Sequence, residues 1–351
     1  MVGDYPRFRL RGIPEVRLLR LGEHPRPQRQ LLAREVFRIV FYLPHDHPDI
    51  ALGVSHAIDS YMHAVGEGPK TITHAHINYS EGSPLTADRW DEIRRVLQDT
   101  RRWSYPDDFS DREQWEIEKR GFDLGILFTG GFGICNGYEL EYQARIPWRP
   151  ASDESERIVS LLTATLPMEY LEEHGPARVR QLALDMASKL RFASGHAGLA
   201  LRLYWWVPYK DIAFRVEPLR YPGIDLREAW RHEKWMGLRV DGVHWLNFLG
   251  PPVLTQLGGA TALRSRLHSA ETTVVELDAE RAVVSLGEQP DAGDLTTGRT
   301  LPAYRELARV LEPWLEPLFL KPHGETAEGP RYTSLRLTED EARRWWRRFL
   351  D

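Results

Sequence analysis

Two histidine pairs have the H-x-H spacing that metal-dependent hydrolases use. His45 and His47 follow a predicted strand directly, and His74 and His76 form a second pair. Imidazoles at this spacing can share one zinc ion, which would activate a water molecule for hydrolysis. A barrel enzyme of this kind needs eight strand–helix units, and the chain shows too few alternations. A metal-dependent hydrolase is therefore the alternative function, and an exposed proline-flanked loop is the simpler interpretation of the first pair.

A glycine-rich stretch runs from Thr129 to Gly137 (TGGFGICNG) and follows a predicted strand, as a nucleotide-binding loop does. Such a loop must lead into a helix whose N-terminus holds the phosphates. The next residues, Tyr138 to Ile146, alternate in polarity like a strand. The stretch is therefore predicted to be the turn of a β-hairpin, and the sequence predicts no cofactor.

Two further patterns lack a part that their chemistry needs. Asp107 precedes Glu116-Ile-Glu-Lys119, which resembles the acidic-plus-lysine motif of nucleases, but Ile117 stands where a carboxylate is required. Cys135 has no base near it in the sequence that could activate it as a nucleophile. No G-x-S-x-G, H-E-x-x-H or P-loop pattern occurs. The sequence therefore indicates a protein that is not an enzyme.

Composition limits the class of protein further. The chain has 351 residues, of which 42% are hydrophobic and 28% charged, and its net charge is -5. This acidic balance supplies no general basic field for direct nucleic-acid binding. Its one cysteine allows no internal disulfide, and no stretch is typical of a signal peptide or a membrane helix. We expect a cytoplasmic protein without a membrane partner.

Hydrophobic periodicity in the first part of the chain predicts alternating strands and helices. Val36 to Leu43 is almost continuously apolar, which indicates a buried strand. Helical spacing follows from about Pro48 to Val65, and again from about Asp88. Phe122–Phe128 and Tyr138–Ile146 then predict the two strands of the hairpin.

The second part of the chain predicts a comparable set of elements. Arg157–Leu166 is expected to be a strand, and Pro176 to begin a helix. Ser194–Trp206 is apolar nearly all round, which we interpret as a buried helix. Val243–Leu249, Thr272–Leu277 and Ala282–Leu286 are predicted strands, Tyr304, Leu307 and Leu311 mark a helix, and Thr338 with Glu341 forms the capping box of the last helix.

Acidic residues are concentrated in three clusters, which lie at 107–118, 153–156 and 169–173. Solvated surfaces and helix N-termini account for such clusters in most proteins. A second interpretation is a surface that mimics nucleic acid and fills a basic cleft, with aromatic anchors such as Tyr170 beside the carboxylates. The predicted partner-binding residues belong to the first cluster and are Asp107, Asp108, Phe109, Asp111, Glu113, Trp115 and Glu116.

Five ordered stretches together resemble a known family. They are Leu166–Pro176 (LPMEYLEEHGP), Phe192–Leu199 (FASGHAGL), Arg220–Asp225 (RYPGID), His244–Gly250 (HWLNFLG) with Leu257–Gly259, and Pro302–Leu307 (PAYREL). In this order they are similar to the bacterial type VI secretion immunity proteins that neutralise VRR-type nuclease toxins. The resemblance covers most of the chain, from about Val36 to the final helix.

The resemblance implies a cytoplasmic antitoxin that binds a nuclease effector and blocks its active site, and it implies no catalytic residues. We interpret the shared stretches as fold determinants: Gly195 and Gly198 allow close packing, Pro222-Gly223 makes a turn, and Trp245 fills the core. Toxin contacts are expected on other surfaces, because specificity must differ between toxin–antitoxin pairs.

These observations predict an α+β protein with a mixed β-sheet and flanking helices, in which two related halves form one compact unit. Residues 1–30 are predicted to be an irregular lead-in, 31–150 the N-terminal half and 151–351 the C-terminal half with the terminal helix. The predicted function is immunity through binding and inhibition of a cognate toxin. A structural scaffold without a toxin partner is a third interpretation, besides the metal-dependent hydrolase.

Overall fold

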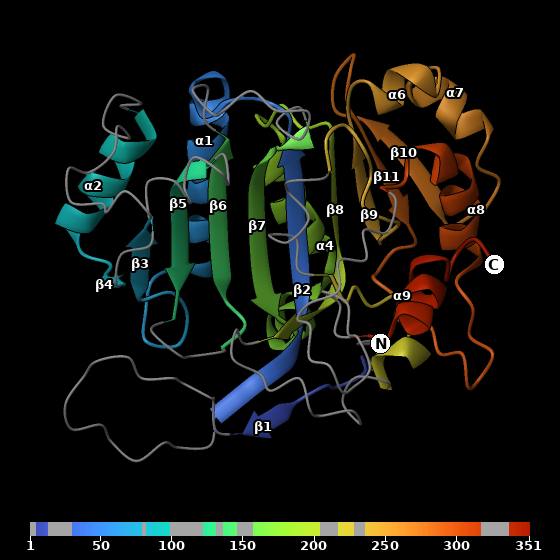
Figure 1. The fold of residues 1–351 in the computed structure, drawn as a ribbon, viewed down its shortest axis with the longest axis horizontal. Coiled ribbons are helices and arrows are strands. Elements are labelled where there is room, and N and C mark those ends of the chain that lie inside the picture. Colours follow the sequence, from blue (N-terminus) through green and yellow to red (C-terminus); the bar gives the residue numbers. More distant parts are fainter. Residues whose placement is uncertain are drawn as a thin grey trace, which may run out of the picture.

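One antiparallel sheet organises the chain (Figure 1). The computed structural model describes residues 5–12, 30–78, 82–98, 122–130, 136–145, 157–203, 217–227, 236–316 and 337–351. The described strands form one sheet of 11 strands in the order β10-β11-β9-β8-β2-β7-β6-β5-β3-β4, with β1 paired to β2 off this path. Every described pair of strands is antiparallel, so the predicted α+β class is confirmed, whereas the prediction of a mixed sheet is wrong for the described strands.

The elements alternate along the chain without separating into a helical and a sheet region. The strands are β1 Leu10–Gly12, β2 Gln30–Leu43, β3 His74–Ile77, β4 Ser83–Pro84, β5 Phe122–Thr129, β6 Glu139–Arg145, β7 Ser160–Pro167, β8 Ser194–Leu203, β9 Leu246–Leu249, β10 Thr272–Glu276 and β11 Ala282–Leu286. The helices are α1 His47–Val65, α2 Ala87–Gln98, α4 Met168–Ala187, α6 Val253–Gln256, α7 Gly259–Ser265, α8 Pro302–Leu311 and α9 Glu339–Trp346, and the 3-10 turns are η3 Glu217–Arg220 and η5 Glu312–Trp314.

The central strand β2 is buried on both faces, which explains its nearly continuous apolar sequence. Phe37, Ile39 and Phe41 point into the main core, on the face that α1 and α4 cover (Figure 1). Val40 and Tyr42 point to the opposite face, where they pack with Val159, Leu161 and Met236. One face of β2 therefore contributes to the main apolar core, and the other face also presents the polar side chains described below.

Helix α1 begins and ends where the sequence predicts. Pro48 occupies its first turn, where the missing N–H is unpaired in any helix. Gly66 ends it with φ +73, and the Gly66 N–H donates to the carbonyl oxygen of Met62 at 2.8 Å. The capping box of α9 is confirmed as well, because Thr338 and Glu341 bond reciprocally.

The glycine-rich stretch joins two paired strands, as the hairpin interpretation predicts. β5 and β6 are antiparallel neighbours, with Thr129 opposite Glu139. No helix follows the stretch, so the described backbone lacks the phosphate-holding helix N-terminus of a nucleotide-binding loop. Cys135 lies outside the described residues.

Three predictions about individual helices and strands need correction. Ser194–Leu203, expected to be helical, is strand β8, which pairs with β2 and β9. Its residues are buried on both faces, so the alternation that marks a strand is missing. Helix α4 begins at Met168, and Pro176 begins only its second segment, after a break at Gly175 (φ 78). The predicted irregular lead-in contains a strand, β1, which pairs with the start of β2.

The two predicted halves share one sheet. β2 from the first half lies between β7 and β8 of the second half. Strands follow outward from β7 as β6, β5, β3, β4, and outward from β2 as β8, β9, β11, β10. Moving outward from the centre, strand numbers mostly fall on the β7 side and mostly rise on the β8 side. A duplication would repeat the same order in both halves, so the connectivity gives no support for one. The boundary near residue 150 lies outside the described residues and stays a prediction.

Each end of the described sheet path has a feature that hinders pairing with a further strand. β4 is two residues long and contains Pro84, which has no N–H to donate. At the other end, the Arg264 guanidinium of α7 donates to the carbonyl oxygen of Val274 at 2.9 Å. The Thr272 N–H donates to the carbonyl oxygen of Ser269 at 3.0 Å. Side chains and turns therefore occupy backbone groups that an edge strand usually leaves open.

None of the helices in the described ranges combines the length and apolar composition that crossing a bilayer requires.

Candidate functional site

The predicted partner-binding segment connects α2 to β5. Asp107, Asp108, Phe109, Asp111, Glu113, Trp115 and Glu116 all lie outside the described residues. The second acidic cluster, at 153–156, lies outside them as well. Both surfaces stay predictions.

The third acidic cluster is engaged within the protein. Glu169 accepts hydrogen bonds from Arg9 and Arg34, and Glu172 accepts from Arg7 at 2.5 Å. These ion pairs fasten the N-terminal segment to the start of α4, where Arg7 also reaches the buried Glu35 at 3.0 Å. Carboxylates that already pair with arginine are poor candidates for attracting a basic partner.

Tyr170, considered as an anchor beside this cluster, is buried rather than available at the surface. Only 5% of it is exposed, and its ring lies 4.3 Å from that of His174. The hydroxyl donates to the carbonyl oxygen of Ala64 at 3.3 Å. Its aromatic surface therefore stabilises the packing of α4 on α1.

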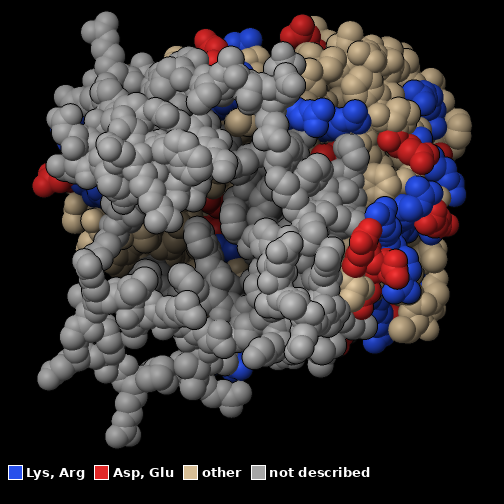
Figure 2. All heavy atoms as spheres, viewed as in Figure 1, with Lys and Arg blue, Asp and Glu red and all other residues tan. Residues whose placement is uncertain are grey.

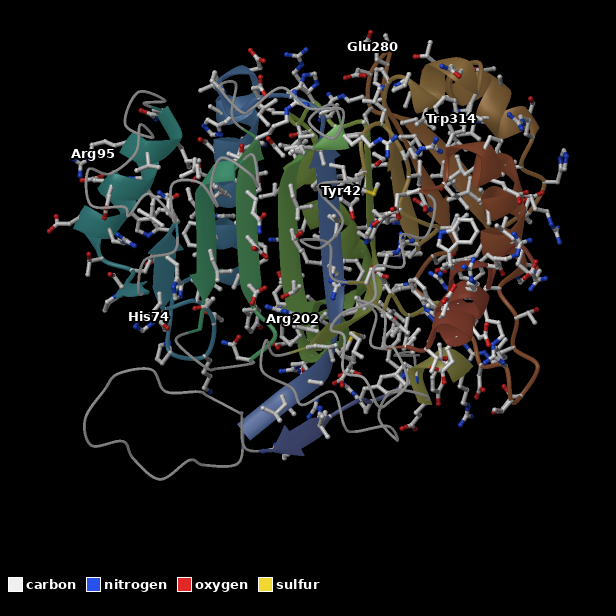
Figure 3. All side chains as sticks on the ribbon, in the orientation of Figure 1. Tyr42, His74, Arg95, Arg202, Glu280 and Trp314 are labelled. Carbon is white, nitrogen blue, oxygen red and sulfur yellow. The ribbon has the colours of Figure 1, made fainter. Side chains whose placement is uncertain are left out.

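The histidine pairs do not form a metal centre. His47 is fully buried, with Nδ1 2.6 Å from the Tyr142 hydroxyl and Nε2 2.8 Å from the carbonyl oxygen of Leu97. Burial lowers its pKa to about 4. His74 lies on β3, near the end of the sheet (Figure 3), and its Nδ1 is 2.9 Å from the Thr73 hydroxyl. All four histidines are described, and among the described residues no group of three potential ligands includes one of them. The hydrolase alternative therefore has no support.

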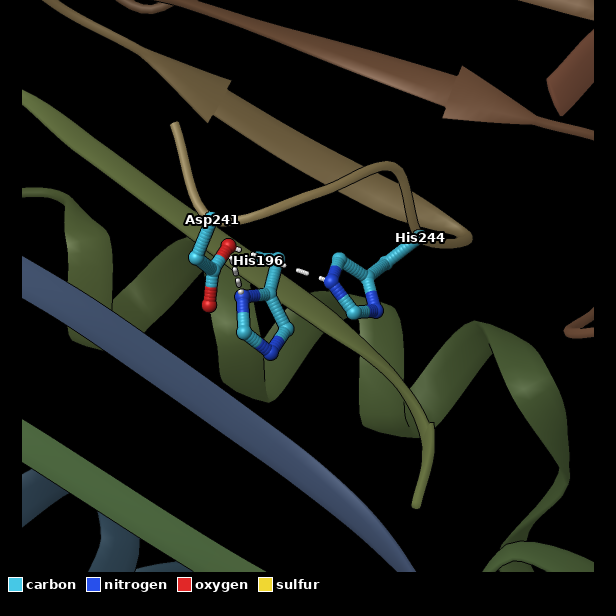
Figure 4. A group of neighbouring side chains, drawn as sticks. All are labelled: His196, Asp241 and His244. Atoms are coloured by element: carbon cyan, nitrogen blue, oxygen red, sulfur yellow. Dashed lines mark hydrogen bonds and ion pairs between the residues drawn. The ribbon is translucent and has the colours of Figure 1, made fainter. Parts of the chain in front are cut away.

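A buried polar cluster lies on the sheet face opposite α1 and α4. His196 comes from the middle of β8, and Asp241 and His244 come from the loop before β9 (Figure 4). His196 Nδ1 donates to Asp241 Oδ1 at 3.0 Å, and the Tyr42 hydroxyl of β2 donates to Asp241 Oδ2 at 2.8 Å. Each of these side chains is at most 4% exposed.

The two imidazole rings of the cluster are stacked. Their centroids are 3.6 Å apart and the ring planes differ by 13°. Gly198 lies against this arrangement, and a Cβ there would be in van der Waals contact, 3.4 Å from both His244 Cβ and the Trp245 backbone nitrogen. His244 is held from the other side by Asn247, whose amide bonds both the N–H and the carbonyl oxygen of His244.

Two buried arginines surround the stack and share Asp225. Arg38 of β2 donates to Asp225 Oδ2 at 3.3 Å and to the carbonyl oxygen of Leu201 at 2.6 Å. The Arg227 backbone N–H donates to Asp225 Oδ1 at 3.0 Å, and its guanidinium lies 3.5 Å from Glu316. Backbone bonds between Leu201, Asp225 and Leu199 run this segment alongside β8.

Burial and neighbouring charges shift the pKa values of the two stacked histidines in opposite directions. Burial opposes the charged form of His196, but the carboxylates of Asp241 and Asp225 outweigh it and raise the pKa of His196. Burial and the His196 cation together hold the pKa of His244 well below its ordinary value. Burial raises the pKa of Glu316 to about 7, although Arg227 opposes this shift. These opposite shifts favour a charged His196 ring beside a neutral His244 ring.

The cluster does not have the geometry of a metal site, although its three potential ligand atoms lie within 4.8 Å of one another. A metal lies in the plane of each imidazole that binds it, about 2.0–2.1 Å from the nitrogen. The planes of two stacked rings that differ by only 13° do not meet within bonding distance of a nitrogen of each ring. His196 Nδ1 is moreover already bonded to Asp241. The cluster therefore joins β8, β2 and the loop before β9 by charge and hydrogen bonds.

We expect the purified protein to contain no stoichiometric zinc, manganese or iron. Both nitrogens of His47 are occupied, and the stacked pair cannot converge on a cation. Elemental analysis by mass spectrometry after dialysis checks this. Near-equimolar metal that disappears in a His45→Ala/His47→Ala variant would restore the hydrolase alternative, and metal that disappears in His244→Phe would overturn the geometric argument.

Sequence reasoning missed this cluster, although the family-like stretches contain most of it. His196, Asp225 and His244 belong to three of these stretches, which were interpreted through their glycines, prolines and apolar residues. His196 and Asp241 are 45 residues apart, and Tyr42 and Asp241 are 199 apart. The available signal was a titratable residue inside an apolar run, above all His196 in SGHAGLAL.

Charges of both signs are interspersed on the described surface. Figure 2 shows Lys and Arg beside Asp and Glu over the part of this face formed by the C-terminal elements. The ion pairs between exposed or half-buried side chains include Arg220–Asp294 and Arg299–Asp291. These two pairs line a cavity of about 430 Å³ together with Tyr5 and Tyr221, so the lining of the cavity has no excess charge of either sign.

Comparison with known proteins gives one family and one fold. The family described as type VI immunity for VRR-NUC matches residues 135–349. A solved structure described as the Pseudomonas aeruginosa type VI secretion protein PA0821 has a similar fold, with a TM-score of 0.68 at 21% sequence identity. The similarity covers 92% of this chain and 84% of that chain. No curated protein matches the chain significantly.

Proposed function

Because the chain belongs to the family of type VI immunity proteins for VRR-NUC, we propose that it binds a VRR-type nuclease toxin and blocks the active site of that nuclease. The family match over residues 135–349 is the observation that carries this proposal. It agrees with the absence of a complete catalytic motif from the sequence. Immunity then depends on stoichiometric binding rather than on turnover.

A titration of nuclease activity tests the mechanism of immunity. The test partner is a VRR-type nuclease encoded beside the gene for this protein. Residual DNA cleavage should fall linearly with added protein and reach zero near one equivalent, because each molecule blocks one active site. Complete inactivation by a small fraction of an equivalent would mean that the protein is an enzyme. Undiminished cleavage at a large excess would contradict the proposed partner.

The proposed contact surface is the segment that contains Asp107, Asp108, Phe109, Asp111, Glu113, Trp115 and Glu116. A nuclease must offer positive potential to a DNA backbone, so carboxylates in its cleft gain electrostatic attraction and associate faster. Phe109 and Trp115 are the proposed anchors, since aromatic side chains dominate binding hot spots. The alternative contact segment is Asp153 to Glu156. The acidic cluster of α4 is a weaker candidate than either, because Arg7, Arg9 and Arg34 already pair with its carboxylates.

Reversing Asp107, Asp108 and Asp111 to Lys should slow association with the toxin by roughly one to two orders of magnitude at low salt, within the range that electrostatic steering covers. The difference from wild type should shrink as ionic strength rises, because salt screens the attraction. Stopped-flow association rates measured against salt concentration check this. Protection of cells against the toxin should weaken in parallel.

A matched control carries the same change of net charge elsewhere. Glu271, Glu276 and Glu280 are exposed around β10, at the opposite end of the sheet from α2. Their triple Lys variant should keep most of the association rate at moderate salt. Equal slowing in both variants would assign the effect to net charge. An unchanged rate in the Asp107 variant would exclude this segment, and a salt-independent wild-type rate would leave a largely apolar contact.

A further inference from the structure

We propose that the stacked His196–His244 pair is a pH-sensitive joint, that is, a contact whose stability depends on how many protons the two rings bind. With one proton on the pair, the contact holds the loop Val240–His244 against β8. A second proton, on His244, breaks the contact and releases the loop. This device is independent of the proposed toxin contact. It follows from the stacking of two titratable rings, 3.6 Å apart, in a place where neither ring can reach water.

The surroundings of the two rings assign the single proton to His196. Both of its nitrogens face carboxylates, with Nδ1 3.0 Å from Asp241 and Nε2 3.6 Å from Asp225. Neither Nε2 atom has a hydrogen-bond partner among the described residues, and that of His244 lies 3.8 Å from Asp241 Oδ1, the oxygen that His196 Nδ1 already contacts at 3.0 Å. Asp241 is also already bonded by His196 and by Tyr42. A carboxylate shared in this way offers little to a second cation.

A second proton would place two parallel cationic rings face to face in a buried site, where like charges repel more strongly than in water. Other cations add to this repulsion. The charged and titratable groups that surround the stack are Asp241 of the same loop, Asp225 and Arg227 of the segment 217–227, Arg38 and Tyr42 of β2, Glu316 after η5, and Arg348 after α9. The buried carboxylates are thus already matched by guanidinium groups and by His196.

The loop that carries Asp241 and His244 is the element that we expect to move when the stack is broken. It is held to the C-terminal region by the Val240 N–H, which donates to the carbonyl oxygen of Trp314 at 2.9 Å, and by the Glu316 N–H, which donates to that of Val240 at 2.8 Å. Trp245 anchors the loop in the core immediately after His244. Opening therefore releases residues 240–244 and their contact with Glu316, and leaves β9 in place.

The sign of the pH effect follows from where each proton is bound. His244 is neutral in the closed joint, so the opened form binds more protons below the ordinary pKa of 6.5, and opening is favoured as the pH falls. Glu316 acts in the opposite direction, because its raised pKa favours the protonated form in the closed state up to about pH 7. His196 acts in the same direction as Glu316, because its raised pKa favours the protonated form in the closed state as the pH falls towards 6.5. The wild-type response is the balance of these effects, so variants must separate them.

His244→Phe keeps a ring in the stack but removes the titration. Hydrogen exchange of the Val240 and Glu316 amides in the whole chain should show the effect. Between pH 6.5 and 5, the ratio of the wild-type opening constant to that of His244→Phe should rise up to tenfold per pH unit, which is the dependence for one proton. Glu316→Gln should steepen the acid response of the otherwise unchanged chain.

Two controls keep the experiment decisive. His63→Phe changes an exposed ring on α1 and should follow the wild-type curve. Nitrogen-15 spectra of the wild-type imidazoles at pH 7 need no variant and should show His196 protonated on both nitrogens and His244 neutral. Parallel exchange curves for wild type and His244→Phe would overturn the joint. Two neutral rings, or a charged His244 in the closed protein, would overturn it as well.

Discussion

Replacing Trp245 by alanine is expected to lower the free energy of unfolding by about 3–5 kcal/mol, the loss typical of large aromatic truncations in a core. Trp245 is 1% exposed. Its ring meets Phe37 of β2 edge-on at 5.8 Å, and Nε1 donates to the carbonyl oxygen of Gly287 at 3.0 Å. The guanidinium of Arg180, on α4, lies 5.1 Å from the ring. One side chain thus contacts the central strand, a covering helix and the end of β11.

Denaturant unfolding of wild type, Trp245→Ala and Trp245→Phe measures this effect. The phenylalanine variant keeps most of the apolar contact and loses the Nε1 hydrogen bond, so its loss should be smaller. Leu52→Ala is the exposed control, since this α1 side chain is 82% exposed, and it should change stability by no more than about 0.5 kcal/mol. A Trp245→Ala protein that is as stable as wild type but fails to bind the toxin would identify Trp245 as an interface residue.

Arg38→Met should destabilise the protein by about 3–5 kcal/mol, as removal of one partner from a buried ion pair does. Arg38 is 3% exposed and Asp225 is 2% exposed. Methionine preserves much of the apolar volume but leaves Asp225 without its guanidinium and the carbonyl oxygen of Leu201 without a donor. The loss therefore comes from buried polar groups without partners rather than from a cavity.

The pH dependence of this loss has a definite sign. Burial opposes the ionised form of Asp225, but His196 and Arg38 outweigh it and hold the pKa of Asp225 well below 3.8. A carboxyl group with a lowered pKa contributes stability above its ordinary pKa, and this contribution disappears as the pH falls. The difference between wild type and Arg38→Met should therefore narrow in acid. Arg38→Met/Asp225→Asn should be less destabilised than the sum of the single variants, and strict additivity would contradict a direct pairing.

The sequence predicts elements well where local signals agree with packing. β2 has an unbroken apolar run, α1 has a proline at its start and a glycine at its end, and α9 has a complete capping box. β8 was predicted as a helix because both of its faces are buried, so the two-residue alternation of a strand is absent. Only the pairing with β2 and β9 decides its conformation, and the sequence does not contain that pairing locally.

The buried cluster could not be predicted for a different reason. Its members come from five separate segments, and the contacts depend on strand order. The order itself is not local, because β2 lies between two strands that come more than 100 residues later in the chain. The toxin contact is harder still to predict from this sequence, since it depends on the partner's surface as well. Family membership thus indicates the function, and the residues that define specificity need measurement.

The features that hinder strand pairing at the ends of the sheet affect how much of the protein a cell can accumulate. If immunity is stoichiometric, as proposed, the protein must outnumber its target, and at high concentration an open strand edge can recruit further copies into aggregates. Arg264 occupies the Val274 carbonyl oxygen at one edge, and Pro84 shortens the other. Arg264→Ala would free one backbone acceptor beside Val275, which is 51% exposed. We therefore expect Arg264→Ala to aggregate more readily than wild type at high concentration, which static light scattering of the two purified proteins would measure.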